Sequence, residues 1–336
     1  MLRRYGLCAL LAACALAPPA VAEEFYKNKT VTFIIGFSVN NGYDAYSRAV
    51  ARSIGKYLPG KPNVVVQNMP GAVSISAINQ LYNLSPRDGT VLGMIDQAVA
   101  LTQTLDPGAL RADVTKFNWI GRVSDNSAVL YAWHTARVQK IRDAFDTELI
   151  VATNGQSSRT LSALMKNLLG MKLKLINGYK GTAEAALAME RGEIEALTQP
   201  YPVLRAEKPD WLRDKKINLL MQAAVDSHPD LKDVPLITDL ARNDDERAML
   251  TFAAGNSRVG RSVMSPPGQP PERVAELRAA FMQTMKDEDF LADIKRSALD
   301  LAPMPGADLQ TFIEESVKVS PEFAARAKTL MEFSEQ

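Results

Sequence analysis

The strongest constraint on the fold is an alternation of apolar, β-rich runs with segments of helical spacing. In the first part of the chain, this pattern predicts strands at 30–37, 63–68 and 89–95, and helices at 44–58 and 74–84. The strand segments are continuous apolar runs, which are typical of parallel strands covered by helices on both faces. The βαβαβ order therefore predicts a parallel sheet with crossover helices.

A second section, beginning near residue 128, repeats the alternation. Strands are predicted at 128–134, 147–155, 172–179 and 217–224, and helices at 158–170 and 181–193. A proline-containing connecting segment is predicted at 226–250, followed by a helical stretch at 270–297. Two such units predict an α/β protein of two lobes, with a ligand cleft between them.

The N-terminus has the pattern of a secretory signal. Arg3 and Arg4 precede an apolar run that ends in Ala-Val-Ala, so residues 1–22 are predicted to be a signal peptide cleaved after Ala22. Two alternatives stay open: a buried N-terminal helix, and a lipoprotein acylated at Cys14. Cys8 and Cys14 are the only cysteines, so cleavage after Ala22 leaves a chain without disulfides or thiolate chemistry. This composition fits the bacterial periplasm.

Charge and motifs disfavour several classes of function. The 39 Lys and Arg residues balance 38 Asp and Glu residues, which leaves no broad basic field for nucleic acid. His134 and His228 are far apart and lack the spacing of a metal site. The sequence also lacks the Gly-x-Ser-x-Gly elbow and the glycine-rich nucleotide motifs. We therefore expect no catalytic residue, no metal and no cofactor.

Three polar loops follow predicted strands and precede predicted helices. They read SVNNGYD at 38–44, QNMPGAVS at 67–74 and TNGQSS at 153–158. Each combines backbone N–H groups at a helix N-terminus with small or amide side chains, which suits a carboxylate or another oxyanion. For any single loop, a polar turn with a helix cap is the competing interpretation.

The order of these motifs resembles the substrate-binding receptors of tripartite tricarboxylate transporters, also called Bug receptors. That family combines a glycine-rich loop leading to Asp, an Asn-x-Pro-Gly-Ala-Gly motif and an Asp-Gly-Thr or Asp-Gly-Tyr motif. The matching residues are Gly42 and Asp44, then Asn68, Pro70, Gly71 and Ala72, then Asp88, Gly89 and Thr90. Later likenesses are FNWIGR, GYKGTAEAALAMERGEIEA, PDLKDVPLITDLA and SPPGQPPERVAELRAAF.

The resemblance implies a type II-like periplasmic binding protein whose lobes are mainly parallel sheets flanked by helices. Lobe one would comprise 23–125 and 224–336, and lobe two 126–223. It further implies a monomeric, non-enzymatic receptor that captures a small organic anion, such as a carboxylate, for membrane transporter subunits. The implied ligand-binding residues are Ser38, Asn40, Asn41, Gly42, Tyr43, Asn68, Ala72, Val73, Ser74, Thr153, Asn154, Gln156, Ser157 and Ser158. A ligand sensor for a signalling partner and an enzyme on the same scaffold are the alternatives.

The sequence departs from the family pattern in both of the first two loops. Asn40 and Asn41 occupy positions where many relatives have glycine, and Val73 replaces the last glycine of the second motif. Asparagine tolerates a positive φ better than most residues do, whereas valine does not. These side chains are expected to narrow the pocket or change its polarity, so a citrate-like ligand is not assumed. Asp44 is expected to cap its helix, because a carboxylate would repel an anionic ligand.

Arginine is the usual bidentate partner of a carboxylate. Arg159 directly follows the third loop and is included among the candidate ligand-binding residues as the first arginine to test. Arg122, Arg258 and Arg261 lie near predicted lobe junctions or loops. Each of these arginines has a solvated surface position as its competing interpretation.

Overall fold

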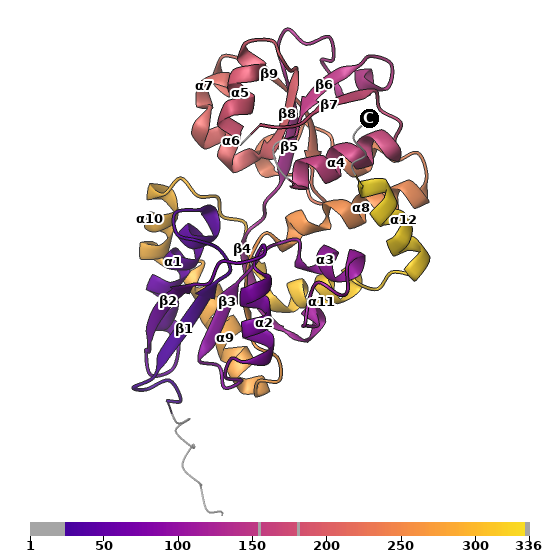
Figure 1. The fold of residues 1–336 in the computed structure, drawn as a ribbon. Helices are drawn as coiled ribbons and strands as arrows, with labels where there is room; N and C mark the ends of the chain where they lie inside the picture. The colour runs from indigo at the N-terminus through magenta and orange to yellow at the C-terminus, as the bar shows by residue number, and fades with distance from the viewer. Residues whose placement is uncertain (1–23, 154–155, 180–181, 333–336) are drawn as a thin grey trace, which may run out of the picture.

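The chain folds into two α/β lobes, one above the other in Figure 1. The computed structural model describes residues 24–153, 156–179 and 182–332. Each lobe is built on its own sheet, and helices flank both sheets. The predicted two-lobed α/β fold is therefore confirmed. The exact boundaries of the lobes remain a prediction, as does the signal peptide, which lies outside the described residues.

The first sheet forms the core of the lower lobe in Figure 1. In spatial order, the strands that the structure describes in it are β11 (Met304–Pro305), β4 (Asn118–Ser124), β10 (Arg261–Ser265), β3 (Val91–Met94), β1 (Thr30–Ile35) and β2 (Asn63–Asn68). The β1 strand pairs in parallel with β2 and β3, as the apolar runs predict.

The second sheet forms the core of the upper lobe. Its described strands, again in spatial order, are β7 (Leu173–Ile176), β6 (Leu149–Ala152), β8 (Ala196–Pro200), β5 (Ala128–Trp133) and β9 (Ile217–Ala223). Here β6 pairs in parallel with β7 and β8. The β5 strand is antiparallel to both β8 and β9.

Both sheets are mixed: β10 and β11 in the first sheet and β5 in the second run opposite to the other described strands, which share one direction within each sheet, as predicted. The β10 strand is antiparallel to β3 and β4 in the first sheet, just as β5 is to its neighbours in the second. The reason is the connection between lobes. Arg261, the first residue of β10, pairs with Ser124, the last residue of β4, so β10 enters its sheet from the side where β4 leaves. The β1, β3 and β4 strands consequently end toward lobe two, and β6, β8 and β9 end toward lobe one.

Six helices flank the first sheet. They are α1 (Gly42–Ile54), α2 (Ile75–Asn83), α3 (Val99–Leu105), α9 (Pro271–Thr284), α10 (Glu288–Arg296) and α11 (Gly306–Ser316), counted within the described ranges. The predicted helical stretch at 270–297 is two helices instead of one. It breaks because Asp287 caps the N-terminus of α10 by accepting a hydrogen bond from the backbone N–H of Phe290 at 2.9 Å.

Other helices belong to the upper lobe or lie between the lobes. Those of the upper lobe are α4 (Gln156–Asn167), α5 (Thr182–Glu190), α6 (Tyr201–Glu207) and α7 (Pro209–Arg213), and those between the lobes are α8 (Asp244–Val259) and α12 (Pro321–Met331). The predicted connecting segment at 226–250 is too long, because α8 begins at Asp244. Asn243 caps this helix. Three acidic residues in its first turn stabilise the helix further by interacting with the positive end of its dipole.

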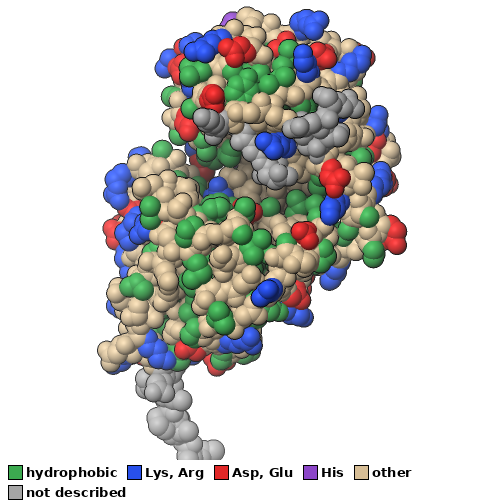
Figure 2. All heavy atoms as spheres, viewed as in Figure 1, with side chains coloured by type: hydrophobic (Ala, Val, Ile, Leu, Met, Phe, Trp, Pro, Cys, Tyr) green, Lys and Arg blue, Asp and Glu red, His purple; other side chains and the backbone are tan. Residues whose placement is uncertain are grey.

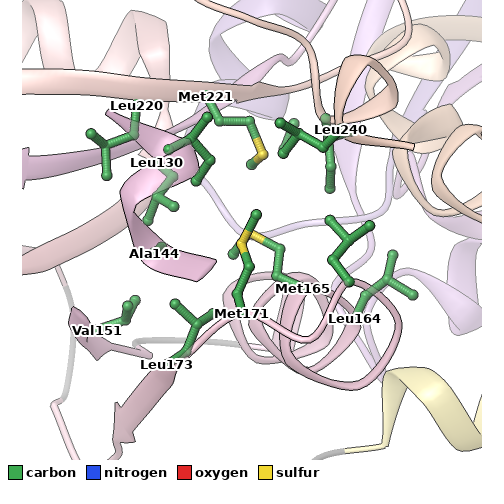
Figure 3. Close-up of a cluster of buried hydrophobic side chains, with 14 of the residues drawn as sticks. Leu130, Ala144, Val151, Leu164, Met165, Met171, Leu173, Leu220, Met221 and Leu240 are labelled. Carbon is green, nitrogen blue, oxygen red and sulfur yellow. The ribbon is translucent and has the colours of Figure 1, made fainter. Parts of the chain in front are cut away.

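The core of the upper lobe extends beyond its own strands and helices. Figure 3 shows Met221 of β9 facing Met165 of α4, with Leu240 beside them. The same buried cluster includes Met249 of α8 and Met331 of α12. Because α12 contacts α4 in the upper lobe and α3 in the lower lobe, this C-terminal helix connects the two lobes on one side of the molecule.

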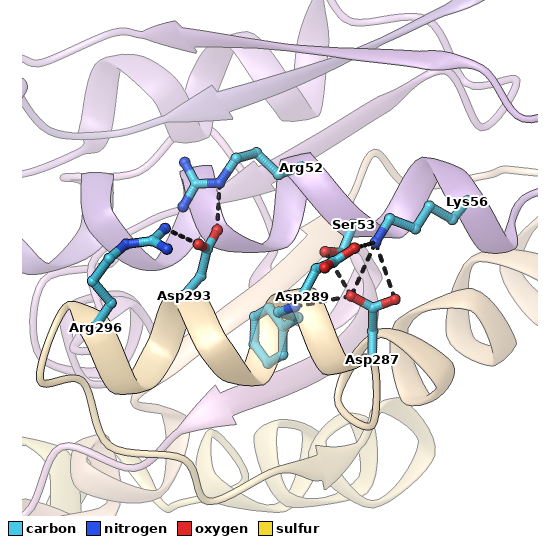
Figure 4. A network of polar contacts seen from close by, with 8 residues as sticks. Arg52, Ser53, Lys56, Asp287, Asp289, Asp293 and Arg296 are labelled. Atoms are coloured by element: carbon cyan, nitrogen blue, oxygen red, sulfur yellow. Dashed lines mark hydrogen bonds and ion pairs between the residues drawn. The ribbon is translucent and has the colours of Figure 1, made fainter.

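A polar network ties the end of α1 and the residues just after it to α10 in lobe one (Figure 4). Asp287 accepts hydrogen bonds from Ser53 Oγ at 3.1 Å, Lys56 Nζ at 3.1 Å and Tyr57 Oη at 2.7 Å. Burial alone would raise the pKa of Asp287, but these bonds and its capping bond outweigh burial and lower the pKa to about 2. The carboxylate is thus held ionised between the two helices.

On the side away from α12, an ion pair joins the lobes. Arg205 of α6 pairs with Asp300, which follows α10, and with Asp230 at 3.0 Å. The backbone of Asp300 is fixed in turn by Tyr46 Oη, which donates to its carbonyl at 2.9 Å and accepts from its N–H at 3.0 Å. Among the described residues, no helix combines the length and the apolar character that a membrane span requires.

Candidate functional site

A cavity of about 1070 Å³ lies between the lobes. It is bordered by α3 from the lower lobe, by the N-terminal turn of α4 and the end of β8 from the upper lobe, and by α8 and α12. Figure 2 shows the molecule hollowed between its upper and lower parts. The neutral polar residues that border the cavity are Gln97, Thr102, Asn126, Ser158, Thr160, Thr182, Thr198, Gln199 and Asn256.

The first predicted loop follows β1, and its side chains mostly hold the start of α1. Asn41 is the N-cap: its Oδ1 accepts the Asp44 backbone N–H at 3.1 Å, and its Nδ2 donates to the Ser38 carbonyl at 2.6 Å. Asn40 has the left-handed φ of 63° that its sequence position suggested. Ser38 and Asn40 are exposed, and Gly42 is exposed in the first turn of α1.

Asn68, at the end of β2, ties the first loop to its neighbouring strand. Its Nδ2 donates to the Phe37 carbonyl at 3.0 Å and to Asp44 at 2.8 Å, and its Oδ1 accepts from Arg48 at 2.9 Å. Burial would raise the pKa of Asp44, but hydrogen bonds from Arg48, Asn68 and the Asn40 N–H outweigh it and lower the pKa. Asn68 and Asp44 therefore stabilise the first loop through hydrogen bonds to its backbone and to each other.

The second predicted loop contains three successive residues in the left-handed region. The φ angles are 44° at Ala72, 51° at Val73 and 72° at Ser74. Val73 is 70% exposed, so little packing offsets the strain of a β-branched residue in this conformation. Ser74 is fully buried; its Oγ donates to the Gly36 carbonyl at 3.1 Å and accepts the Asp96 N–H at 3.2 Å. It thus joins the ends of β1 and β3.

Tyr43 connects the first loop to the cavity through Arg261. The ring of Tyr43 is buried and stacks on Phe37, with 4.1 Å between ring centroids. Its hydroxyl accepts the Gln97 backbone N–H at 3.0 Å and donates to Asp96 at 3.3 Å. The guanidinium carbon of Arg261 lies 4.0 Å from the centroid of the same ring. Burial raises the pKa of Tyr43, although Arg261 opposes the rise, so the hydroxyl stays protonated.

Arg261 orients two amide side chains at the back of the cavity. Its Nη1 donates to Gln97 Oε1 at 3.0 Å, and its Nη2 donates to Asn126 Oδ1 at 3.2 Å. A guanidinium can only donate, so both amide oxygens must face it, and each amide keeps its NH₂ group for another partner. Gln97 and Asn126 both border the cavity. The interpretation of Arg261 as a solvated surface residue is wrong, because these contacts place it half-buried at the lobe junction.

The third predicted loop is described only in part. Thr153 is buried, and its hydroxyl donates to the Asn177 side chain. Ser158 and Arg159, in the first turn of α4, border the cavity, with Ser158 buried and Arg159 exposed. Asn154 and the side chains of Gln156 and Ser157 lie outside what the structure describes. Of the predicted binding residues, Ser158 and Arg159 are those whose described atoms border the cavity.

Several cavity residues were not predicted from the sequence. Gln97 and Asn126 follow strands, but neither lies in a recognisable motif. Thr198 of β8 is 5% exposed and borders the cavity, and its Oγ1 has no hydrogen-bond partner within the described part of the chain. A signal was available for two of them, since Gln97 and Asn126 lie just beyond the ends of β3 and β4, which point toward the other lobe.

Asp96 lies near Arg261 at the back of the cavity. Burial raises the pKa of Asp96, while the Ala98 N–H and the nearby Arg261 act in the opposite direction. Near the cavity mouth, exposed Arg159 and Lys328 accompany exposed Asp106 and Glu332. Within the described ranges, no group of three or more His, Cys, Asp or Glu side chains is placed to hold a metal ion.

Two α/β lobes with mixed sheets and a cavity between them define the fold of two-lobed periplasmic binding proteins. Three solved structures share it over almost their whole length. A TctC solute-binding protein from Polaromonas, solved without ligand, has a TM-score of 0.69 at 19% identity, covering 91% of this chain and 99% of that one. The periplasmic binding protein BugD has a TM-score of 0.58 at 18% identity, covering 91% and 98%.

The third structure is MatC from Rhodopseudomonas palustris with bound malate. It has a TM-score of 0.56 at 20% identity, covering 90% of this chain and 99% of that one. No family model and no curated protein matches the chain at the level of sequence. At identities of 18–20% the likeness establishes the fold. The fold implied by the sequence resemblance is thus confirmed, and function has to be argued from the site.

Proposed function

We propose that this protein is an extracytoplasmic solute-binding receptor that captures a small organic anion, a carboxylate, between its lobes. The ligand is bound and released unchanged. By contacting both lobes, the anion favours the closed form through its higher affinity for that form, and the closed form is what a membrane partner recognises. Subunits of a tripartite tricarboxylate-type transporter are the proposed partner, and the periplasm is the proposed location.

The observation that carries the proposal is the pair of amides held by Arg261. Because their oxygens are fixed by the guanidinium, Gln97 and Asn126 offer N–H donors where they border the cavity. A carboxylate only accepts hydrogen bonds, so this arrangement matches it. Thr198 of the upper lobe adds a hydroxyl group that has no hydrogen-bond partner within the described residues. The cation of Arg261 lies directly behind the amides and stabilises a negative charge in front of them.

One of the solved structures named above supports the same ligand class. MatC carries bound malate, and its fold matches nearly the whole of this chain. The predicted loops of lobe one remain proposed binding elements, because their backbone lies at the strand ends that point toward the other lobe. The side chains of Asn41, Asn68 and Ser74 already form hydrogen bonds within lobe one. Contacts between these loops and a ligand would therefore come mainly from backbone N–H groups and from the exposed Ser38 and Asn40.

The test is calorimetric titration of the purified protein with malate and other carboxylates, with neutral solutes as controls. A Gln97→Glu variant keeps an oxygen for Arg261 but replaces the donor by a second carboxylate oxygen. Repulsion between like charges should then weaken carboxylate binding by at least tenfold. The matched control is Gln283→Glu, the same change on an exposed position of α9, and it should bind like the wild type.

Two outcomes would count against the proposal. If neutral solutes bind and no carboxylate does, the ligand class is wrong. If carboxylates bind equally well to the wild type and to the Gln97→Glu variant, the ligand lies elsewhere and the amide pair is not its site.

A further inference from the structure

The cavity has an apolar compartment next to its polar end. Leu101 and Leu105 of α3, Leu161 of α4, Ala253 of α8 and Met331 of α12 border it. These residues come from both lobes and from the two helices between them, so the apolar wall is a feature of the assembled molecule. The leucines and Ala253 are partly buried and pack against the core of the upper lobe.

The size of the cavity exceeds what a compact, fully hydrophilic acid requires. Pockets for drug-sized ligands measure about 300–1,000 Å³, and this cavity measures about 1070 Å³. A malate-sized ligand held at the amide pair would leave the leucine-lined part facing water, which is unfavourable for apolar surface. A ligand with a hydrocarbon body would cover that surface.

Charged residues near the cavity argue against a second buried anion site among the leucines. Arg159 and Lys328 are accompanied by Asp106 and Glu332, and all four are exposed. The apolar part thus lies between a donor-rich end at the lobe junction and a mouth of balanced charge. This order fits a molecule with one anionic head and an apolar tail.

On this basis, and resting on the proposed function, we propose that the ligand is an amphipathic organic acid whose carboxylate lies at Gln97 and Asn126. Its alkyl or aryl body lies against Leu101, Leu105 and Leu161, beneath the C-terminal helix α12. This assigns α12 a role in ligand recognition, because Met331 contributes to the wall that the tail contacts.

The experiment measures dissociation constants for a series of straight-chain acids, from acetate through butanoate and hexanoate to octanoate, with malate alongside. Burial of each additional methylene should strengthen binding by roughly fourfold until the tail reaches the mouth. The heat-capacity change of binding should become more negative along the series, since apolar surface is being buried.

Substitutions in the apolar wall test where the apolar tail of the ligand binds. Leu101→Gln and Leu161→Gln should each flatten the dependence on chain length while leaving malate binding within about twofold of the wild type. The matched control is Leu291→Gln, on a helix that does not border the cavity, where the leucine is 39% exposed. Gln97→Glu should weaken octanoate and malate alike, which shows that octanoate binds through its carboxylate at the same site.

The outcomes separate the two proposals. If no carboxylate binds, the proposed function fails. If malate binds but the longer acids bind no more tightly, the receptor function stands and the apolar-tail proposal is overturned. A length dependence that is unchanged in both leucine variants would also overturn it, because the tail would then lie outside this compartment.

Discussion

Replacing Val73 by glycine measures the backbone strain at this residue, which lies in a proposed binding loop. Its φ of 51° is in the left-handed region, and its side chain is 70% exposed. An L-residue in this conformation costs about 1–2 kcal/mol, a penalty that glycine does not carry. Glycine also gives the unfolded chain more freedom, which opposes the gain by about 0.5–1 kcal/mol. Val73→Gly should therefore raise the free energy of unfolding by about 0.5–1 kcal/mol.

The matched control is Val39→Gly in the first loop. Val39 is also exposed, at 55%, but its φ is not in the left-handed region. Only the unfolded-state effect should remain, so Val39→Gly should lower the free energy of unfolding by about 0.5–1 kcal/mol. Urea denaturation of both variants and of the wild type gives the comparison. If Val73→Gly is destabilised as much as Val39→Gly, the backbone at Val73 is not strained and the reasoning fails.

Three further predictions concern parts of the fold that support the cleft. Asp287→Asn should lose about 1–2 kcal/mol of stability at pH 7 in urea denaturation; because the pKa of Asp287 is lowered to about 2, this deficit should fade as the pH falls from about 4 toward 2. Arg205→Ala removes the interlobe ion pair, so small-angle scattering of the unliganded protein should give a larger radius of gyration, and affinity should fall by no more than about fivefold; an unchanged radius would refute a restraining role. Gly121→Ala would place a Cβ 2.2 Å from a ring carbon of Phe281 and should lower stability by about 1–3 kcal/mol, whereas Gly108→Ala, with its nearest atom at 3.7 Å, should be nearly neutral in the same assay.

Part of the fold could be predicted because its signals are local, whereas no strand was predicted at β4 or β10 and no helix at α3, α8, α11 or α12. The apolar runs at 30–37, 63–68 and 89–95 contain β1, β2 and β3, and the helical spacing at 44–58 contains most of α1. The directions of the antiparallel strands could not be predicted from local sequence patterns. The β5 and β10 strands are antiparallel to their neighbours because the chain passes from one lobe to the other before each of them. No short sequence pattern indicates such a passage.

The position of the site could be predicted better than its residues. Loops at strand ends were expected to face the cleft, and Ser158 and Arg159 do border the cavity. Gln97, Asn126 and Thr198 were missed because a single amide or hydroxyl near a strand end resembles any other polar residue. Their proximity depends on contacts between segments more than a hundred residues apart, such as the bond from Arg261 to Gln97.

The same chemistry that made the first two loops attractive as binding elements also explains why their side chains are engaged elsewhere. Small and amide residues at strand ends can bind an anion, but they can equally satisfy backbone groups where strands stop and helices begin. Asn41 caps α1, Asn68 holds the first loop, and Ser74 joins β1 to β3. These bonds make lobe one a preorganised surface whose loops need not rearrange when a ligand arrives. Selectivity would then depend on the amides that Arg261 fixes at the junction and on the apolar wall, which combines residues of both lobes and of α12.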